Sequence, residues 1–160
     1  MKSLEQYYEA HALEIYRYIY FMCYNHNLAE DVLQETFYRT FHHLENNQNM
    51  ELRPWLYKVA RNVMVDVIRK ENKSVAHKSE FFDQQTANTD PETKLLINER
   101  YKEVIFSVNS LPENQKQALI LSSFHNLSYE EVASILNLTT SSVKSLIFRA
   151  RTNLRKGAKS

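Results

Sequence analysis

The 160-residue sequence predicts an all-α protein made of two small helical domains joined by a flexible linker. Apolar residues recur at the 3.6-residue spacing of helices rather than at the two-residue spacing of strands. Glycine occurs once, at Gly157, and this scarcity also favours helices. A polar stretch without sustained periodicity separates two amphipathic blocks. We therefore expect domains at residues 1–71 and 90–160 with a linker at 72–89.

The composition excludes several classes of protein. Apolar residues at 43% and charged residues at 24% are typical of a globular chain. No apolar run approaches the roughly 20 residues of a membrane-spanning helix, and no signal peptide is evident, so we expect a cytoplasmic protein without membrane insertion. A single cysteine, Cys23, excludes an intramolecular disulfide and, with His26, makes only a weak metal pair. With one glycine, no phosphate-cradling loop can form, and we expect neither metal nor cofactor.

Three apolar stripes predict that the N-terminal block is a bundle of at least three helices. Each stripe follows helical spacing and would face the others. The stripes are Ile15, Tyr18, Ile19 and Met22; Leu33, Phe37, Phe41 and Leu44; and Leu56, Val59, Ala60, Val63 and Val67.

The third of these helices carries basic and amide groups opposite its apolar stripe. Trp55 and Tyr57 stand at its start, where rings can stack on exposed bases for about 1–3 kcal/mol per base. On pattern alone, a simple core position for Trp55 is the favoured alternative. The preceding amide-rich segment, residues 45–50, suits base-edge contacts or a simple polar turn. The polar face comprises Lys58, Arg61, Asn62 and Arg69, with Val65 among them.

The second helix, residues 28–44, begins with Glu30, Asp31, Gln34 and Glu35. Acidic side chains in a first turn stabilise a helix through its dipole. They can equally meet a basic partner, and both interpretations stay open.

The C-terminal block begins with an N-cap and proline at residues 90–92, followed by a helix. Ser110 and Glu113 have capping-box spacing and predict a further helix start. The core stripe expected between these two points comprises Ile97, Tyr101, Val104, Ile105, Val108 and Leu111.

Residues 128–156 have the pattern of a helix-turn-helix. Ser128 and Glu131 form a capping box, Asn137 can take the left-handed conformation that ends a helix, and Thr139 can cap the next one. The second helix should start at about Thr140. Its buried stripe should comprise Val143, Leu146, Ile147, Ala150 and Leu154.

Charge is segregated at this end of the chain. Residues 139–160 hold six basic residues and no acidic one, whereas the whole chain has 20 basic and 19 acidic residues. One or two such charges would merely complement a helix dipole. Six of them behind a helix-turn-helix pattern indicate a DNA partner.

Three segments in order resemble the bacterial sigma-70 superfamily, specifically the small extracytoplasmic-function (ECF, group IV) sigma factors that keep only regions 2 and 4. AEDVLQETF (29–37) resembles region 2.2, and RPWLYKVARNVMVDVIRK (53–70) resembles regions 2.3 and 2.4. LPENQKQALILSSFHNLSYEEVASILNLTTSSVKSLIFRARTNLRK (111–156) resembles region 4. The resemblance covers nearly the whole chain.

This resemblance implies an RNA polymerase sigma factor that promotes transcription initiation. Region 2.2 would dock on the β′ clamp helices of core RNA polymerase, which also contacts such factors through its β subunit, and an anti-sigma factor is an expected partner. Implied docking residues are Asp31, Gln34, Glu35 and Phe37. Implied −10 DNA contacts are Asn46, Asn47, Trp55, Lys58, Arg61, Asn62 and Arg69. Implied −35 DNA contacts are Ser141, Lys144, Ser145, Phe148, Arg149, Arg151 and Arg155.

The chain departs from the family pattern at several positions. Asn126 and Asn137 stand where glycine is common, and asparagine tolerates the left-handed region. Ser141 and Ser142 replace a usual Gly-Thr pair, and Leu146 stands where arginine is frequent.

Two other classes of protein compete with the sigma-factor interpretation. A stand-alone helix-turn-helix regulator would bind duplex half-sites as a dimer, but the N-terminal block shows no coiled-coil heptads. A nucleic-acid enzyme would need a catalytic set, whereas Asp66 and the other carboxylates are scattered. We therefore expect no catalytic residues.

Overall fold

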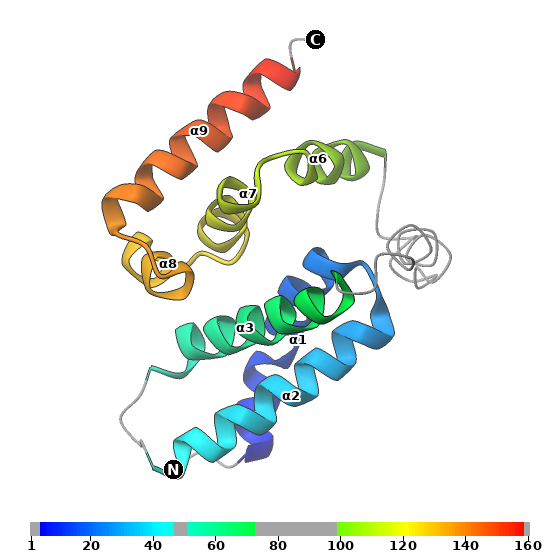
Figure 1. The fold of residues 1–160 in the computed structure, drawn as a ribbon, viewed down its shortest axis with the longest axis vertical. Helices are drawn as coiled ribbons and strands as arrows, with labels where there is room; N and C mark the ends of the chain where they lie inside the picture. Colours follow the sequence, from blue (N-terminus) through cyan, green and yellow to red (C-terminus); the bar gives the residue numbers. More distant parts are fainter. Residues whose placement is uncertain (1–3, 47–50, 73–98, 159–160) are drawn as a thin grey trace. The chain divides into compact units, whose positions relative to one another are not determined.

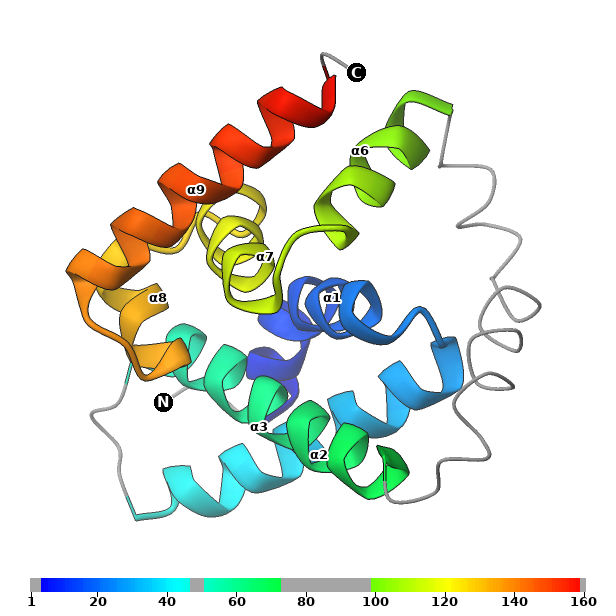
Figure 2. The same cartoon turned by 45° about the horizontal axis from the view of Figure 1, so that its top comes forward.

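The computed structural model describes residues 4–46, 51–72 and 99–158, with side chains placed for all of these except 72, 99–102 and 158. The chain divides into two compact units, residues 1–91 and 92–160. Every regular element within the described ranges is a helix, as Figures 1 and 2 show, which confirms the all-α expectation. None of these helices is long and apolar enough to cross a membrane.

The N-terminal unit contains α1 (Leu4–Cys23), α2 (His26–Leu44) and α3 (Leu52–Asn72), and each helix packs on the other two. The connection between α1 and α2 is tight. Tyr24 adopts a left-handed φ of 52°, and the Asn25 side chain then accepts a hydrogen bond from the backbone N–H of Leu28 (3.1 Å). This N-cap starts α2.

Most residues of the predicted stripes form the core of this unit, whereas Met22, Phe41, Leu44 and Val67 are only half-buried. Thr36 and Thr40 are also buried, and their hydroxyls donate to the carbonyls four residues earlier, each at 2.7 Å. Both buried polar groups are therefore satisfied. The fully or nearly fully buried apolar residues are Ile15, Tyr18, Ile19, Cys23, Ala29, Val32, Leu33, Phe37, Leu56, Tyr57, Val59, Ala60, Val63 and Met64.

The C-terminal unit contains α6 (Glu99–Asn109), α7 (Glu113–Leu119), the π-helical turn η2 (Ile120–Phe124), α8 (Tyr129–Leu136) and α9 (Thr140–Ala158). Helix α9 packs on α6, α7 and α8. Its buried side is formed by Val143, Ile147 and Ala150, as predicted, while Leu146 and Leu154 are half-buried.

The helix-turn-helix signals are confirmed in detail. Ser128 Oγ accepts from the Glu131 N–H (3.1 Å), and Glu131 Oε1 accepts from the Ser128 N–H (2.9 Å). Asn137 ends α8 with a left-handed φ of 57°. Thr139 Oγ1 then accepts from the Ser142 N–H (3.1 Å), which caps α9. Local capping therefore fixes the turn between α8 and α9.

Two predictions for the preceding helices are wrong. Ser110 does not cap α7, because Pro112 is the N-cap residue and the Ser110 hydroxyl instead donates to the Ser107 carbonyl (2.6 Å). Val104 is 48% exposed because α6, within this unit, packs mainly on α9 and buries only a narrow side around Val108. The predicted helix start at residues 90–92, and Ile97, lie outside the described residues.

Candidate nucleic-acid interfaces

The outer side of α9 is a polar and cationic surface opposite a buried stripe. Because Val143, Ile147 and Ala150 face the core, the residues between them are held outward. Phe148, 72% exposed, is an apolar group on this surface. The predicted −35 residues Ser141, Lys144, Ser145, Phe148, Arg149, Arg151 and Arg155 are all exposed and lie on this one helix.

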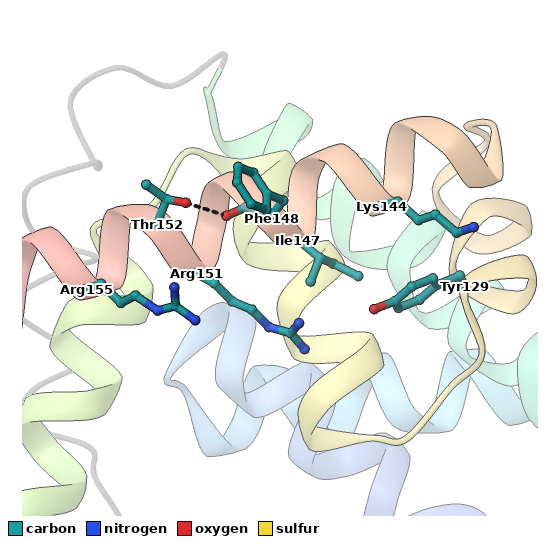
Figure 3. Close-up of a pocket in the computed structure, with 7 residues that line it drawn as sticks. All are labelled: Tyr129, Lys144, Ile147, Phe148, Arg151, Thr152 and Arg155. Atoms are coloured by element: carbon teal, nitrogen blue, oxygen red, sulfur yellow. Dashed lines mark hydrogen bonds between the residues drawn. The ribbon is translucent and has the colours of Figure 1, made fainter.

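Part of this surface borders an open groove of about 280 Å³ beside α9 (Figure 3). Ile147 contributes an apolar wall, while Lys144, Arg151 and Arg155 supply cationic groups and no acidic residue lines the groove. The Thr152 hydroxyl donates to the Phe148 carbonyl (2.9 Å). Such a groove suits an anionic backbone lying against an apolar patch.

Tyr129 lines the same groove from the first turn of α8, near Lys144 (Figure 3). Sequence reasoning missed this residue. The position of Tyr129 directly after the N-cap residue Ser128 could have indicated it, because a side chain there lies at the start of the first helix of the motif.

A second polar face runs along α3. Asn62 and Arg69 are exposed and Lys58 and Arg61 are half-buried, so all four predicted residues reach the surface. Asp66 lies near this face and approaches Arg39 of α2 at 4.0 Å. Val65 and Ile68 are partly exposed between the polar groups. The face thus combines cationic, amide and apolar groups.

Trp55 stands in the first turn of α3, where it is half-buried. Its indole stacks on the imidazole of His43, from the last turn of α2, with ring centroids 4.1 Å apart and an interplanar angle of 13°. Within the described residues, the indole Nε1 is buried without a hydrogen-bond partner. Asn46 is exposed just beyond α2, and Asn47 lies outside the described residues.

Tyr57 is fully buried, so the predicted stacking of its ring on bases is wrong. Its ring packs against Tyr18, and its hydroxyl donates to Glu14 Oε2 (3.2 Å). The physical reason is that α3 contacts both α1 and α2, which widens its buried arc beyond the predicted stripe.

Glu14 of α1 is the centre of a polar network that holds the start of α3. Its carboxylate accepts from Arg53 Nε (3.2 and 3.3 Å) and from Tyr57, and it lies 3.0 Å from His11 Nδ1. Burial alone would raise the pKa of Glu14, but these hydrogen bonds and the Arg53 charge together lower it. Burial and the neighbouring carboxylate raise the pKa of Tyr57, which stays a neutral donor.

The outer side of α2 carries the acidic patch predicted as a docking surface. Asp31 and Gln34 are exposed, and Glu35 accepts from Arg39 Nε at 2.8 Å. Phe37 does not belong to this surface: it is 4% exposed and packs against Tyr8 of α1, with ring centroids 5.0 Å apart. Its place on the stripe that faces α1 decides its burial, so the assignment of Phe37 as a direct contact is corrected.

Other ionisable groups have structural explanations. Burial raises the pKa of the Cys23 thiol to about 11, which keeps it protonated at neutral pH. Burial lowers the pKa of Lys116, against the opposing charge of Glu113. Across the part of the chain that the structure describes, no three His, Cys, Asp or Glu residues are placed to hold a metal ion.

Comparison with known proteins matches both units. The family described as Sigma-70 region 2 matches residues 7–74, and Sigma-70, region 4 matches residues 100–154. The ECF RNA polymerase sigma factor SigM of Bacillus subtilis (strain 168) is 33% identical over 156 residues, which span 96% of this chain and 93% of SigM. The ECF RNA polymerase sigma factor SigE of Mycolicibacterium smegmatis is 30% identical over 158 residues, which span 97% of this chain and 61% of SigE.

Solved structures share the fold. The sigma factor RpoE, in complex with the anti-sigma factor NepR from Bartonella quintana, aligns with a TM-score of 0.77 at 21% identity over 99% of this chain and 98% of RpoE. CnrH, in complex with the cytosolic domain of CnrY, aligns with a TM-score of 0.72 at 20% identity over 98% and 87% of the two chains. Matches to both sigma regions along one chain disfavour a stand-alone regulator, and the protein belongs to the sigma-70 family as an ECF RNA polymerase sigma factor.

Proposed function

We propose that the two units divide promoter recognition between them, with the N-terminal unit at the −10 element and on core RNA polymerase and the C-terminal unit at the −35 element. The observation that carries this division is that each unit presents its own polar, cationic helix face, α3 in one and α9 in the other. Residues 72–89 then act as the linker that spans the distance between the elements. At about 3.3 Å per residue, an extended chain of this length reaches roughly 60 Å.

At the −35 element, α9 enters the major groove. Lys144 and Arg149 bind base edges or phosphates from the exposed side of the helix, and Phe148 supplies apolar contact. Ser141 and Ser145 lie on the same side, towards the start of α9, where base contacts of helix-turn-helix proteins concentrate. Arg151 and Arg155, along the groove, bind the DNA backbone.

At the −10 element, a base leaves the duplex and is captured beside Trp55 with the help of Asn46 and Asn47. The α3 face then holds the melted strand through Lys58, Arg61, Asn62 and Arg69. Binding of the extruded base and single strand offsets the few kcal/mol, by rough estimate, that unstacking costs. This mechanism needs binding energy alone, and no residue performs covalent chemistry.

Core polymerase docks on α2 through Asp31, Gln34 and Glu35, which meet the β′ clamp helices, while the β subunit adds further contacts. Phe37 contributes from beneath by holding α2 against α1. Glu35 is already oriented by Arg39, which reduces the freedom that the side chain loses on docking. An acidic helix face of this kind suits a basic partner surface.

We also propose that an anti-sigma factor controls this protein. The support is that RpoE and CnrH, which share its fold, were solved with an anti-sigma factor and with the cytosolic domain of CnrY, respectively. Such an inhibitor would cover surfaces that the polymerase or the promoter otherwise occupies.

Promoter binding with and without core polymerase tests this division. We expect the free protein to bind a labelled promoter duplex weakly, since nothing holds its two units at promoter spacing. With core polymerase the complex should tighten and depend on both elements. Tight, sequence-specific binding by the protein alone, measured by fluorescence anisotropy, would contradict the proposal.

A further inference from the structure

The stack of His43 on Trp55 joins the end of α2 to the start of α3. His43 lies in the last turn of α2 and Trp55 in the first turn of α3, and residues 45–51 link these helices. The ring centroids are 4.1 Å apart at 13°, closer and flatter than the Tyr16–Tyr20 stack in the same unit, at 5.9 Å and 23°. Two flat rings held this closely restrict each other's orientation.

Both partners of the stack are attached to rigid supports. The start of α3 is fixed to α1 through Arg53 and Tyr57, which both bind Glu14. His43 is carried by α2, whose buried threonines and apolar stripe pack it into the bundle. The indole is therefore held between a fixed backbone and a fixed ring, and it stays half-exposed.

The neighbouring histidine serves a different contact. His42 points to the exposed ring of Tyr38, with centroids 4.6 Å apart and an interplanar angle of 69°. Consecutive helix residues lie about 100° apart around the axis, so His42 and His43 cannot share one partner. This pair offers a matched control on the same turn of the same helix.

The geometry points to His43 as a positioning residue for −10 recognition: its imidazole covers one face of the Trp55 indole and holds that ring in the orientation that receives the extruded base. This inference rests on the proposed role of Trp55 in base capture. His43 acts through the indole, and its contribution requires a flat ring at position 43 rather than a charge.

The test uses the full chain with core polymerase and a promoter that carries 2-aminopurine at the base to be extruded. We expect His43→Ala to slow promoter opening by roughly three- to tenfold, the loss of one aromatic stacking contact. His43→Phe should restore opening to within about twofold of the original protein, because it keeps a stackable ring. His42→Ala should leave opening unchanged.

Tryptophan fluorescence gives a readout that a merely structural role would not reproduce, because Trp55 is the only tryptophan in the chain. His43→Ala should increase acrylamide quenching of the indole, whereas His43→Phe and His42→Ala should not. Binding to core polymerase, measured in parallel, should be equal in all three variants. An equal loss of core binding and of opening in His43→Ala would overturn the inference, since His43 would then support only the bundle.

Two further outcomes separate this inference from the proposed function. If Trp55→Ala impairs opening and His43→Ala does not, the positioning role is wrong and base capture by Trp55 stands. If Trp55→Ala opens the promoter normally, the base-capture proposal fails and the role of His43 falls with it. The inference would also be overturned if His43→Phe opened the promoter as slowly as His43→Ala while its indole was as protected from acrylamide as in the original protein.

Discussion

The two units of this protein build their candidate DNA surfaces in different ways. In the C-terminal unit, the turn that aims α9 is made by neighbours in sequence, through the Ser128–Glu131 capping box, the left-handed Asn137 and the Thr139 cap. In the N-terminal unit, the start of α3, which carries Trp55, is held by Glu14 of α1 through Arg53, and the indole itself stacks on His43 of α2. The proposed −35 helix is thus oriented by local capping, whereas the proposed base-capture site depends on contacts between the helices of the bundle.

The largest effect on promoter opening is expected from changes at Trp55 in the N-terminal unit. Trp55→Ala should reduce the rate of promoter opening by about 10- to 100-fold, because it removes a stacking surface worth roughly 1–3 kcal/mol per base. Stopped-flow 2-aminopurine fluorescence with core polymerase measures this rate. Trp55→Phe keeps a smaller ring, so its opening rate should lie between those of Trp55→Ala and the original protein. A normal opening rate in Trp55→Ala would contradict the proposal that Trp55 captures the extruded base.

In the C-terminal unit, Lys144→Ala and Arg149→Ala should each weaken −35 binding by about 5- to 50-fold, because a good contact to a base is worth about 1–3 kcal/mol. The salt dependence of binding shows whether each lost contact was to a phosphate. Ser134→Ala, an exposed change on α8, is the control. Unchanged affinity of the holoenzyme for the −35 element in both variants would contradict the assignment of this helix face.

The hydrogen-bond network around Glu14 predicts that the stability of the N-terminal unit depends on pH. Because folding lowers the pKa of Glu14, its stabilisation is fully present above the unfolded value near 4.5 and is lost as the pH falls through the folded value. Glu14→Gln should cost about 1–2 kcal/mol at pH 7 and should reduce this acid sensitivity.

Urea unfolding at pH 7 and at pH 4, followed by the fluorescence of Trp55, measures both effects of Glu14→Gln. Glu9→Gln, an exposed change on the same helix, is the control. An unchanged free energy of unfolding in Glu14→Gln would show that the network does not hold the start of α3.

The smallest effect is expected at the local turn. Asn137 has a left-handed φ of 57°, which asparagine tolerates better than alanine because its side-chain amide can hydrogen-bond locally. Asn137→Ala should therefore lower the free energy of unfolding by about 1 kcal/mol. Asn137→Gly should be neutral or slightly stabilising, since glycine has no penalty there. Thermal unfolding measures both. Equal stability of the alanine and glycine variants would show that the turn is held by packing rather than by the backbone preference of its residue.

The same contrast explains what could be predicted from the sequence. Helix periodicity and the caps of α8 and α9 act over three or four residues, so the all-α class and the exposed side of α9 were predictable. The predicted Ser110 capping box does not form because Pro112, two residues later, is the N-cap residue of α7.

The remaining errors concern contacts between helices. Tyr57 was assigned to DNA and Phe37 to polymerase, but both are buried against α1. His43 and Tyr129 were missed because their partners, Trp55 and the groove beside α9, lie in other elements. A helix pattern shows which side chains share a face but not how wide the arc is that its neighbours cover.

Run-off transcription with purified core polymerase tests the central claim most directly. A genomic promoter library is transcribed with core polymerase alone, with this protein alone and with both. We predict discrete new start sites only when both are present, each preceded by a −35 and a −10 element. Duplex binding by the protein without any new start site would contradict the account and would favour a regulator that acts without the polymerase.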